Sequence, residues 1–165
     1  MQTQEELDEL AYYAGFIGTL QAGYTDLHYL SEGWKENCDD EALLGVSVTG
    51  IADGGNYKRY NWQRASLQAK RANEETAKAI GIKSAARITC IKPEGTASLV
   101  LGTSSGIHAR HSHYYIRRMR LGKSESVAIY LQENHPALVK QDLAKPEGLI
   151  LELPQKSPDR SIYRS

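Results

Sequence analysis

The pattern of apolar and polar positions begins with a helix. Thr3 and Glu6 have the spacing of a capping box, in which the two side chains satisfy backbone N–H groups at a helix start. Apolar residues then recur at the three- and four-residue intervals of one helix face, at Leu7, Leu10, Ala11, Ala14 and Ile17. The pattern predicts an amphipathic helix there, and residues 25–33 read as a second helical stretch.

A strand, a helix and another strand follow. Residues 42–49 form a short, apolar, β-rich run, and residues 87–91 form a second one. Between them, Asn61 is suited to cap a helix and Gly81 to end it. One face of that helix is formed by Trp62, Ala65, Ala69, Ala72, Thr76 and Ile80. Because strands joined by a helix usually lie parallel, residues 42–91 predict a βαβ unit.

The C-terminal third predicts a strand at 114–121, a helix at 125–134 and a last strand at 149–153. Residues 154–165 are polar and contain two prolines, which is typical of a tail. We therefore expect an α/β fold with helices and mostly parallel strands, in a domain of residues 1–153 followed by a tail of residues 154–165.

Composition limits the class of protein. The 165 residues, 41% of them hydrophobic, suffice for one compact domain. No apolar run approaches the roughly 18 residues of a membrane span, and the N-terminal residues lack the pattern of a secretory signal. The two cysteines, Cys38 and Cys90, form neither a disulfide framework nor a zinc-binding spacing. We therefore expect a cytoplasmic protein that does not bind membranes.

Charge is unevenly distributed, although the net charge is zero. Residues 1–55 carry a local charge of −10, and residues 56–123 carry +11. A basic segment can attract the phosphates of nucleotides or of nucleic acid, or it can simply be solvated. The basic residues are spread over helix and strand and are not interleaved with aromatic side chains, which disfavours a nucleic-acid-binding module.

The loop after the strand at 87–91 is the strongest candidate site. It runs Lys92, Pro93, Glu94, Gly95, Thr96, Ala97 and Ser98. Proline ends the strand, glycine permits a tight turn, and a helix can start at Thr96 or Ser98. Free backbone N–H groups and the helix dipole would then point at one place, which favours an anion. The alternative is an ordinary strand-to-helix turn.

A second polar stretch follows at residues 102–120. It contains three histidines, His108, His111 and His113, but neither cysteine nor carboxylate, so we predict no metal site. Arg118 would lie on one face of the strand at 114–121, where it could pair with a carboxylate or a phosphate. His108 and Arg118, with Lys92, are therefore possible supporting residues for an anion site.

These motifs resemble those of a known family. Residues 91–108, with a Lys-Pro-x-Gly-Thr loop followed by Gly-Ile-His, resemble the later half of ribonucleotide reductase catalytic chains, most closely the adenosylcobalamin-dependent (class II) ribonucleoside-triphosphate reductases. Residues 18–26, 44–51 and 114–118 continue the resemblance. It implies part of a ten-stranded α/β barrel, in which Pro93, Glu94, Gly95, Thr96, Ala97 and Ser98 bind the substrate's phosphates.

Glu94 departs from the family pattern, since many relatives have serine there. A carboxylate beside a phosphate would repel it, so we expect Glu94 to turn away or to pair with a base.

The family's radical cysteine, in a Cys-Gly-Glu motif, has no counterpart in this sequence, and neither Cys38 nor Cys90 matches a catalytic cysteine. We therefore expect no catalytic residue on this chain and no reductase activity by it alone. The resemblance implies a ribonucleotide substrate, adenosylcobalamin, a thioredoxin-like reductant and a complementary chain that carries the rest of the barrel. The alternative is a structural barrel half that docks to such a chain and binds no ligand.

Overall fold

The computed structural model describes residues 3–54 and 58–163 and divides the chain into two compact units. The first unit is Met1–Ala109 and the second is Arg110–Ser165. This division does not coincide with the predicted boundary between residues 153 and 154. Over the described ranges, none of the helices combines the length and the apolar character needed to cross a membrane.

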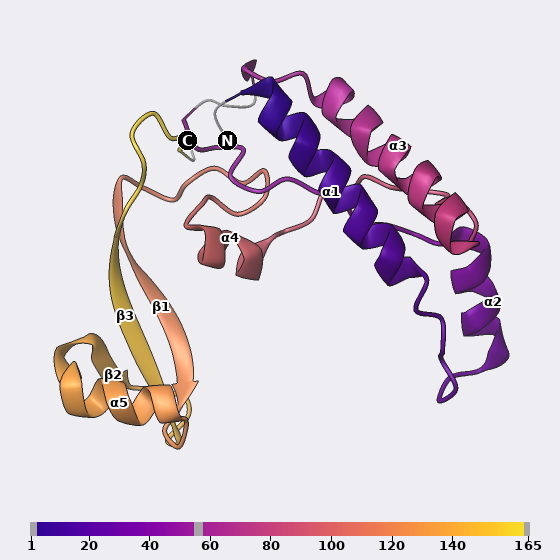
Figure 1. Ribbon diagram of the computed structural model, residues 1–165. Helices are drawn as coiled ribbons and strands as arrows, with labels where there is room; N and C mark the ends of the chain where they lie inside the picture. Colours follow the sequence, from indigo (N-terminus) through magenta and orange to yellow (C-terminus); the bar gives the residue numbers. More distant parts are fainter. Residues whose placement is uncertain (1–2, 55–57, 164–165) are drawn as a thin grey trace. The chain divides into compact units, whose positions relative to one another are not determined.

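Two long helices lie side by side in the first unit (Figure 1). Helix α1 spans Gln4–Ala22 and begins at the predicted capping box. Thr3 Oγ1 accepts the Glu6 N–H at 3.2 Å, and the Glu6 carboxylate accepts the Thr3 N–H at 3.4 Å. Helix α3 spans Trp62–Ile80, is capped by the Asn61 side chain, and ends at Gly81 with φ 76°. The predictions for both helices are confirmed.

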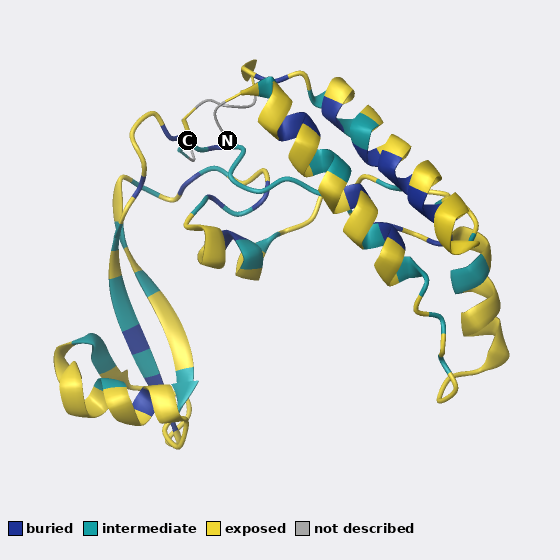
Figure 2. Ribbon diagram, in the orientation of Figure 1, coloured by how far each residue is buried: buried dark blue, intermediate teal, exposed yellow. Residues whose placement is uncertain are grey.

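The core of this unit lies where α1 and α3 face each other, as the buried stripe of α3 in Figure 2 shows. Ala65, Ala69, Ala72 and Thr76 are buried as predicted, whereas Ile80 at the end of the face is 41% exposed. The helices approach closely at Gly15, because a Cβ there would lie 2.5 Å from the Ala69 carbonyl oxygen.

The predicted helix at residues 25–33 is wrong. The chain turns there instead, with Leu30 N donating to Leu27 O at 2.8 Å, and helix α2 begins only at Glu32 and runs through Glu32–Glu41. Thr25 and Asp26 are poor helix formers, because short polar side chains compete for nearby backbone groups.

The two predicted strands of the first unit pair in parallel, but only briefly. Val46 and Thr89 form an isolated parallel bridge, with Val46 N donating to Ile88 O and Cys90 N to Val46 O, both at 2.9 Å. The parallel direction and the helix between the two segments are as predicted, but neither segment forms a strand of its own. The pairing is shorter than predicted, and no third strand joins it among the described residues.

The second unit contains a three-stranded sheet of order β1-β3-β2. Strand β1 spans Tyr114–Gly122, β2 spans Val139–Gln141 and β3 spans Gly148–Lys156. Helix α5, Ser126–Asn134, and a 3-10 turn at Pro136–Leu138 connect β1 to β2. Both strand pairs are antiparallel, so the expectation of mostly parallel strands is wrong for this unit. The short connection between β2 and β3 explains the direction of that pair, since parallel neighbours need longer crossovers, whereas the longer connection between β1 and β3 allows either direction.

Strand β3 continues three residues beyond the predicted start of the polar tail. Pro154 lies opposite Ile116 on β1, while β2 reaches only Leu149–Leu151 on the other side. Proline has no N–H to donate, and it is tolerated here because β3 has a single neighbour at this point. Beyond β3, the tail is hydrogen-bonded to the rest of the second unit at Ser157, whose N–H donates to His113 O at 2.9 Å.

Candidate functional site

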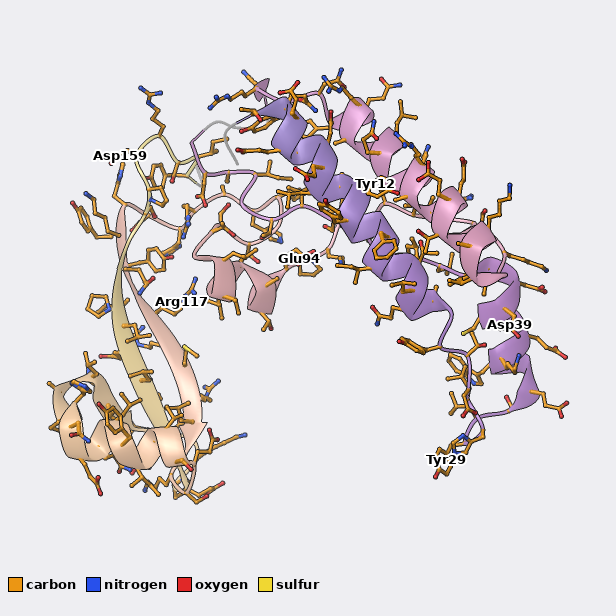
Figure 3. All side chains as sticks on the ribbon, in the orientation of Figure 1. Tyr12, Tyr29, Asp39, Glu94, Arg117 and Asp159 are labelled. Atoms are coloured by element: carbon orange, nitrogen blue, oxygen red, sulfur yellow. The ribbon has the colours of Figure 1, made fainter. Side chains whose placement is uncertain are left out.

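The candidate site lies directly after the parallel bridge, where helix α4, Gly95–Leu101, begins. Glu94 precedes it with φ 54° and ψ 32°, a left-handed conformation, and Figure 3 shows its place at the start of α4. The helix starts at Gly95 and not at Thr96 or Ser98. Its first three N–H groups, on Gly95, Thr96 and Ala97, are not capped by any described side chain. Such N–H groups attract anions.

The two hydroxyls of the loop differ in their surroundings. Ser98 is buried, its N–H donates to Glu94 O at 3.0 Å, and its hydroxyl donates to Gly95 O at 3.1 Å. Ser98 therefore holds the first turn of α4 together. Thr96 is exposed, so its hydroxyl is accessible to a ligand.

The first residues of the loop include one base and one acid, Lys92 and Glu94. Lys92 Nζ lies 3.7 Å from Glu94 Oε1, and the Glu94 side chain is only 13% exposed against 47% for Lys92. The expectation that Glu94 pairs with a base is therefore confirmed. The pairing reduces the repulsion that the carboxylate would exert on an anion bound at the helix start.

Loop residues 103–106 hold the start and the end of α4. Thr103 N donates to Ser98 O at 2.9 Å, and the Ser105 hydroxyl hydrogen-bonds to Pro93 O. Gly106, at φ 52°, lies so close to the loop that a Cβ would be 2.5 Å from Lys92 O. The structure thus brings residues 44–53, 92–98 and 103–106 together within the first unit.

The supporting residues predicted from sequence are placed as follows. His108 is exposed, and its N–H donates to Ser105 O at 2.8 Å, next to the loop that holds α4. Arg118 belongs to the second unit, where its Nε donates to Glu152 Oε1 at 2.7 Å across β1 and β3. A role for Arg118 in the anion site remains a prediction. Among residues 3–54 and 58–163, no group of three or more His, Cys, Asp or Glu could hold a metal ion.

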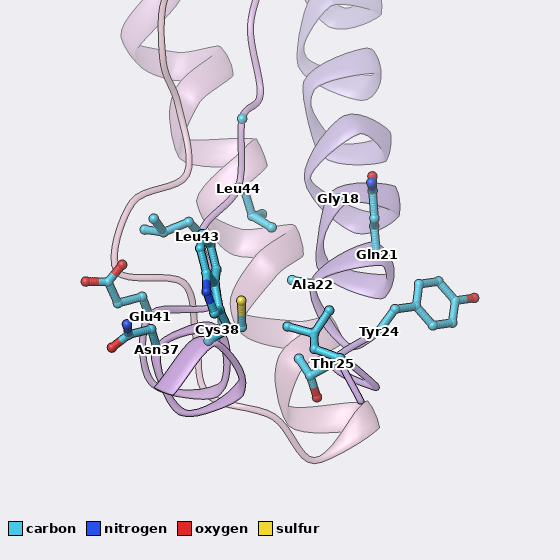
Figure 4. Close-up of a pocket in the computed structure, with 14 residues that line it drawn as sticks. Gly18, Gln21, Ala22, Tyr24, Thr25, Asn37, Cys38, Glu41, Leu43 and Leu44 are labelled. Carbon is cyan, nitrogen blue, oxygen red and sulfur yellow. The ribbon is translucent and has the colours of Figure 1, made fainter. Parts of the chain in front are cut away.

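Sequence reasoning did not find a pocket that lies elsewhere in the first unit. A cavity of about 510 Å³ lies between the end of α1, helix α2 and residues 42–45 (Figure 4). Its lining includes Gln21, Thr25, Trp34 and Cys38. The aromatic and small residues that follow α1 could have indicated this pocket, but such residues are also typical of a packed surface.

Comparisons with known proteins give relatives of one kind. No family model matches the chain. It is 31% identical over 100 residues to an adenosylcobalamin-dependent ribonucleoside-triphosphate reductase of Euglena gracilis, which covers 54% of this chain and 13% of that protein. It is 32% identical over 89 residues to a probable adenosylcobalamin-dependent ribonucleoside-triphosphate reductase of Dictyostelium discoideum, covering 51% of this chain and 12% of the relative.

Among solved structures, the chain is similar to a B12-dependent (class II) ribonucleotide reductase, with a TM-score of 0.65 and 18% identity. The match covers 91% of this chain and 26% of the solved one. The chain thus spans about an eighth of the curated relatives and a quarter of the solved protein. The chain is similar to a segment of the adenosylcobalamin-dependent (class II) ribonucleotide reductases, by sequence over about half of its length and by an α/β fold over nine-tenths of it.

Proposed function

We propose that this chain supplies the substrate-phosphate loop of a ribonucleotide reductase that converts ribonucleoside triphosphates to deoxyribonucleotides. The observation that carries the proposal is the uncapped start of α4, which follows the parallel Val46–Thr89 bridge and is contacted by residues 103–106. The names and fold of the relatives support a nucleotide as the anion.

The loop residues have different roles in the proposed binding. The N–H groups of Gly95, Thr96 and Ala97 donate to phosphate oxygens, and the exposed Thr96 hydroxyl adds a further donor. Pro93 and Glu94 shape the turn, and Ser98 keeps the first helical turn intact. Lys92 supplies positive charge, part of which Glu94 neutralises.

Reduction itself needs groups that we do not assign to this chain. Cys38 lines the pocket beside α2, and Cys90 is exposed beside the strand bridge, and neither lies in a Cys-Gly-Glu motif. We propose that a radical cysteine and its acid–base partner come from the rest of the barrel, and the reducing equivalents from a thioredoxin-like protein. His108 and Arg118 are proposed as supporting residues of the complete site.

Adenosylcobalamin, which the relatives' names specify, would supply the radical that starts the reduction. No group of three or more His, Cys, Asp or Glu in the described part of the chain could hold a metal ion. We assign no residue of this chain to the cofactor. We propose that the ten-stranded barrel, with the Val46–Thr89 bridge among its strands, is completed by other residues of a cytoplasmic enzyme.

Titration of the chain with ribonucleoside triphosphates tests the proposal. We expect saturable binding that Thr96→Ala weakens by about ten-fold or more, the value of one hydrogen bond to a charged group. Thr89→Ala, another exposed threonine of the same unit, is the control and should leave the affinity unchanged. Equal affinities of the Thr96→Ala variant and the unmodified chain would count against the loop. A chain that binds no nucleotide would instead be a structural part of the barrel.

A further inference from the structure

The Thr49 hydroxyl joins two loops that are far apart in the sequence. Its Oγ1 donates to Ser104 O at 2.9 Å and accepts the Gly106 N–H at 3.0 Å. One side chain therefore satisfies a carbonyl and an amide of residues 103–106 at the same time, which constrains that loop more than a single hydrogen bond would.

Asp53 reinforces this connection four residues later. Its Oδ2 accepts the Ser104 N–H at 2.7 Å, and the backbone N–H groups of Gly50 and Ile51 donate to Ser104 O and Gly106 O at 2.9 and 3.3 Å. Gly50, at φ 79°, lies against Thr103, since a Cβ on it would be 2.9 Å from Thr103 Cβ. Residues 49–53 thus form a rigid support for residues 103–106.

Residues 103–106 in turn contact the proposed phosphate loop. Residues 103–106 contact the start of the loop through Ser105 and Gly106 and the end of its first helical turns through Thr103. The position of the Gly95, Thr96 and Ala97 N–H groups therefore depends on residues 49–53, although these do not belong to the loop itself. Donors that are held in place before binding lose less entropy when the ligand arrives.

We propose that Thr49 and Asp53 are positioning residues, which hold the start of α4 in the geometry that binds a triphosphate. This inference rests on the proposed function of the loop. Neither residue needs to touch the ligand, and their effect acts through Ser104, Ser105 and Gly106.

The test compares variants of two threonines with the same hydrogen-bonding pattern. Thr19 Oγ1 also donates to a carbonyl, Gly15 O at 2.7 Å, and accepts an amide, Asn73 Nδ2 at 2.9 Å, and both partners belong to the helices α1 and α3. Dissociation constants for inorganic triphosphate and ATP would be measured for Thr49→Val, Thr49→Ser, Asp53→Ala and Thr19→Val, at a temperature at which each is folded.

We expect Thr49→Val and Asp53→Ala each to weaken triphosphate binding about five-fold. Thr49→Ser, which keeps the hydroxyl, should bind within two-fold of the unmodified chain, about 0.4 kcal/mol. Thr19→Val should lower the melting temperature without changing the dissociation constant. Asp53→Ala keeps the test decisive should Thr49→Val fail to fold.

Two results would overturn the inference while leaving the loop assignment intact. One is an unchanged affinity in both Thr49→Val and Asp53→Ala while the unmodified chain binds triphosphate. The other is an equal loss in Thr19→Val, which would trace the effect to general destabilisation. Failure of the unmodified chain to bind triphosphate would overturn the proposed function and, with it, this inference.

Discussion

Lys92 and Glu94 form an ion pair, Nζ to Oε1 at 3.7 Å, immediately before the first turn of α4. The partly buried carboxylate therefore belongs to the loop that we propose to bind phosphate, and it engages the lysine. Glu94 weakens the attraction for an anion in two ways, since its carboxylate repels the anion and engages the cation that would attract it.

Replacement of Glu94 by glutamine should strengthen triphosphate binding. Removing the negative charge releases Lys92, and we expect an affinity about three- to ten-fold higher at low salt, with the gain shrinking as salt screens the charges. Calorimetric titration at two ionic strengths measures this. Glu74→Gln, on the exposed face of α3, makes the same change in net charge and should have no such effect. An unaltered or weaker affinity in Glu94→Gln would contradict the prediction.

Gly15 and Gly18 should respond in opposite ways to alanine. A Cβ at Gly15 meets the Ala69 backbone at 2.5 Å, which cannot yield, whereas at Gly18 it meets the Leu44 side chain at an ordinary 3.6 Å. Gly15→Ala should cost about 1–3 kcal/mol of unfolding free energy. Gly18→Ala should gain about 0.5–1 kcal/mol, because alanine favours a helix interior. Both tryptophans belong to this unit, so fluorescence-monitored urea unfolding reports on it. Equal effects of the two substitutions would refute the close helix contact.

The buried pair of Thr19 and Asn73 should behave as one unit. Asn73 Nδ2 donates to Thr19 Oγ1 at 2.9 Å, and its Oδ1 accepts the Ala85 N–H at 2.9 Å. Asn73→Ala removes the hydrogen bonds to the buried Thr19 hydroxyl and to the part-buried Ala85 N–H and should cost about 2–4 kcal/mol. In a double-mutant cycle, adding Thr19→Val should cost less than in the unmodified chain, by about 0.5–1 kcal/mol. Strict additivity would show that the two side chains do not interact.

Acid should destabilise the second unit through Glu152. Hydrogen bonds from Lys140 and then from Arg118 hold the pKa of this carboxyl below its ordinary value of 4.5. A carboxyl whose pKa is lowered on folding binds its proton more readily when unfolded. Its stabilising contribution is therefore complete above pH 4.5 and is lost as the pH falls through the lower pKa of the folded state.

The pH dependence can be followed by NMR through the amide signals of β1 and β3. Glu152→Gln should lower stability at neutral pH and flatten the loss of stability below pH 4.5. Glu133→Gln, an exposed residue of α5, is the matched control and should retain the original profile. The same slope in Glu152→Gln as in the unmodified chain would show that other carboxyls control the acid response.

Local signals predicted much of the fold. Thr3 with Glu6, and Asn61 with Gly81, mark helix ends through groups within a few residues of each other, and both helices begin where these signals place them. Residues 25–33 have apolar spacing without such signals, and the helix predicted there does not form. Antiparallel pairing in the second unit and the extension of β3 to Lys156 were missed, because they depend on which distant strand pairs with which.

The candidate loop shows the same limit. The sequence by itself determined that a glycine-containing turn opens a helix, since proline, glycine and hydroxyl residues act on the backbone beside them. The sequence left open whether Glu94 turns away or pairs with a base, and the structure shows that it pairs with Lys92 and that the Ser98 hydroxyl bonds inside the helix. The tertiary structure also decided that the Thr49 hydroxyl donates to the carbonyl of Ser104, 55 residues later, and so supports residues 103–106. Contacts over such distances depend on the packing of the whole unit, and no short stretch of sequence encodes them.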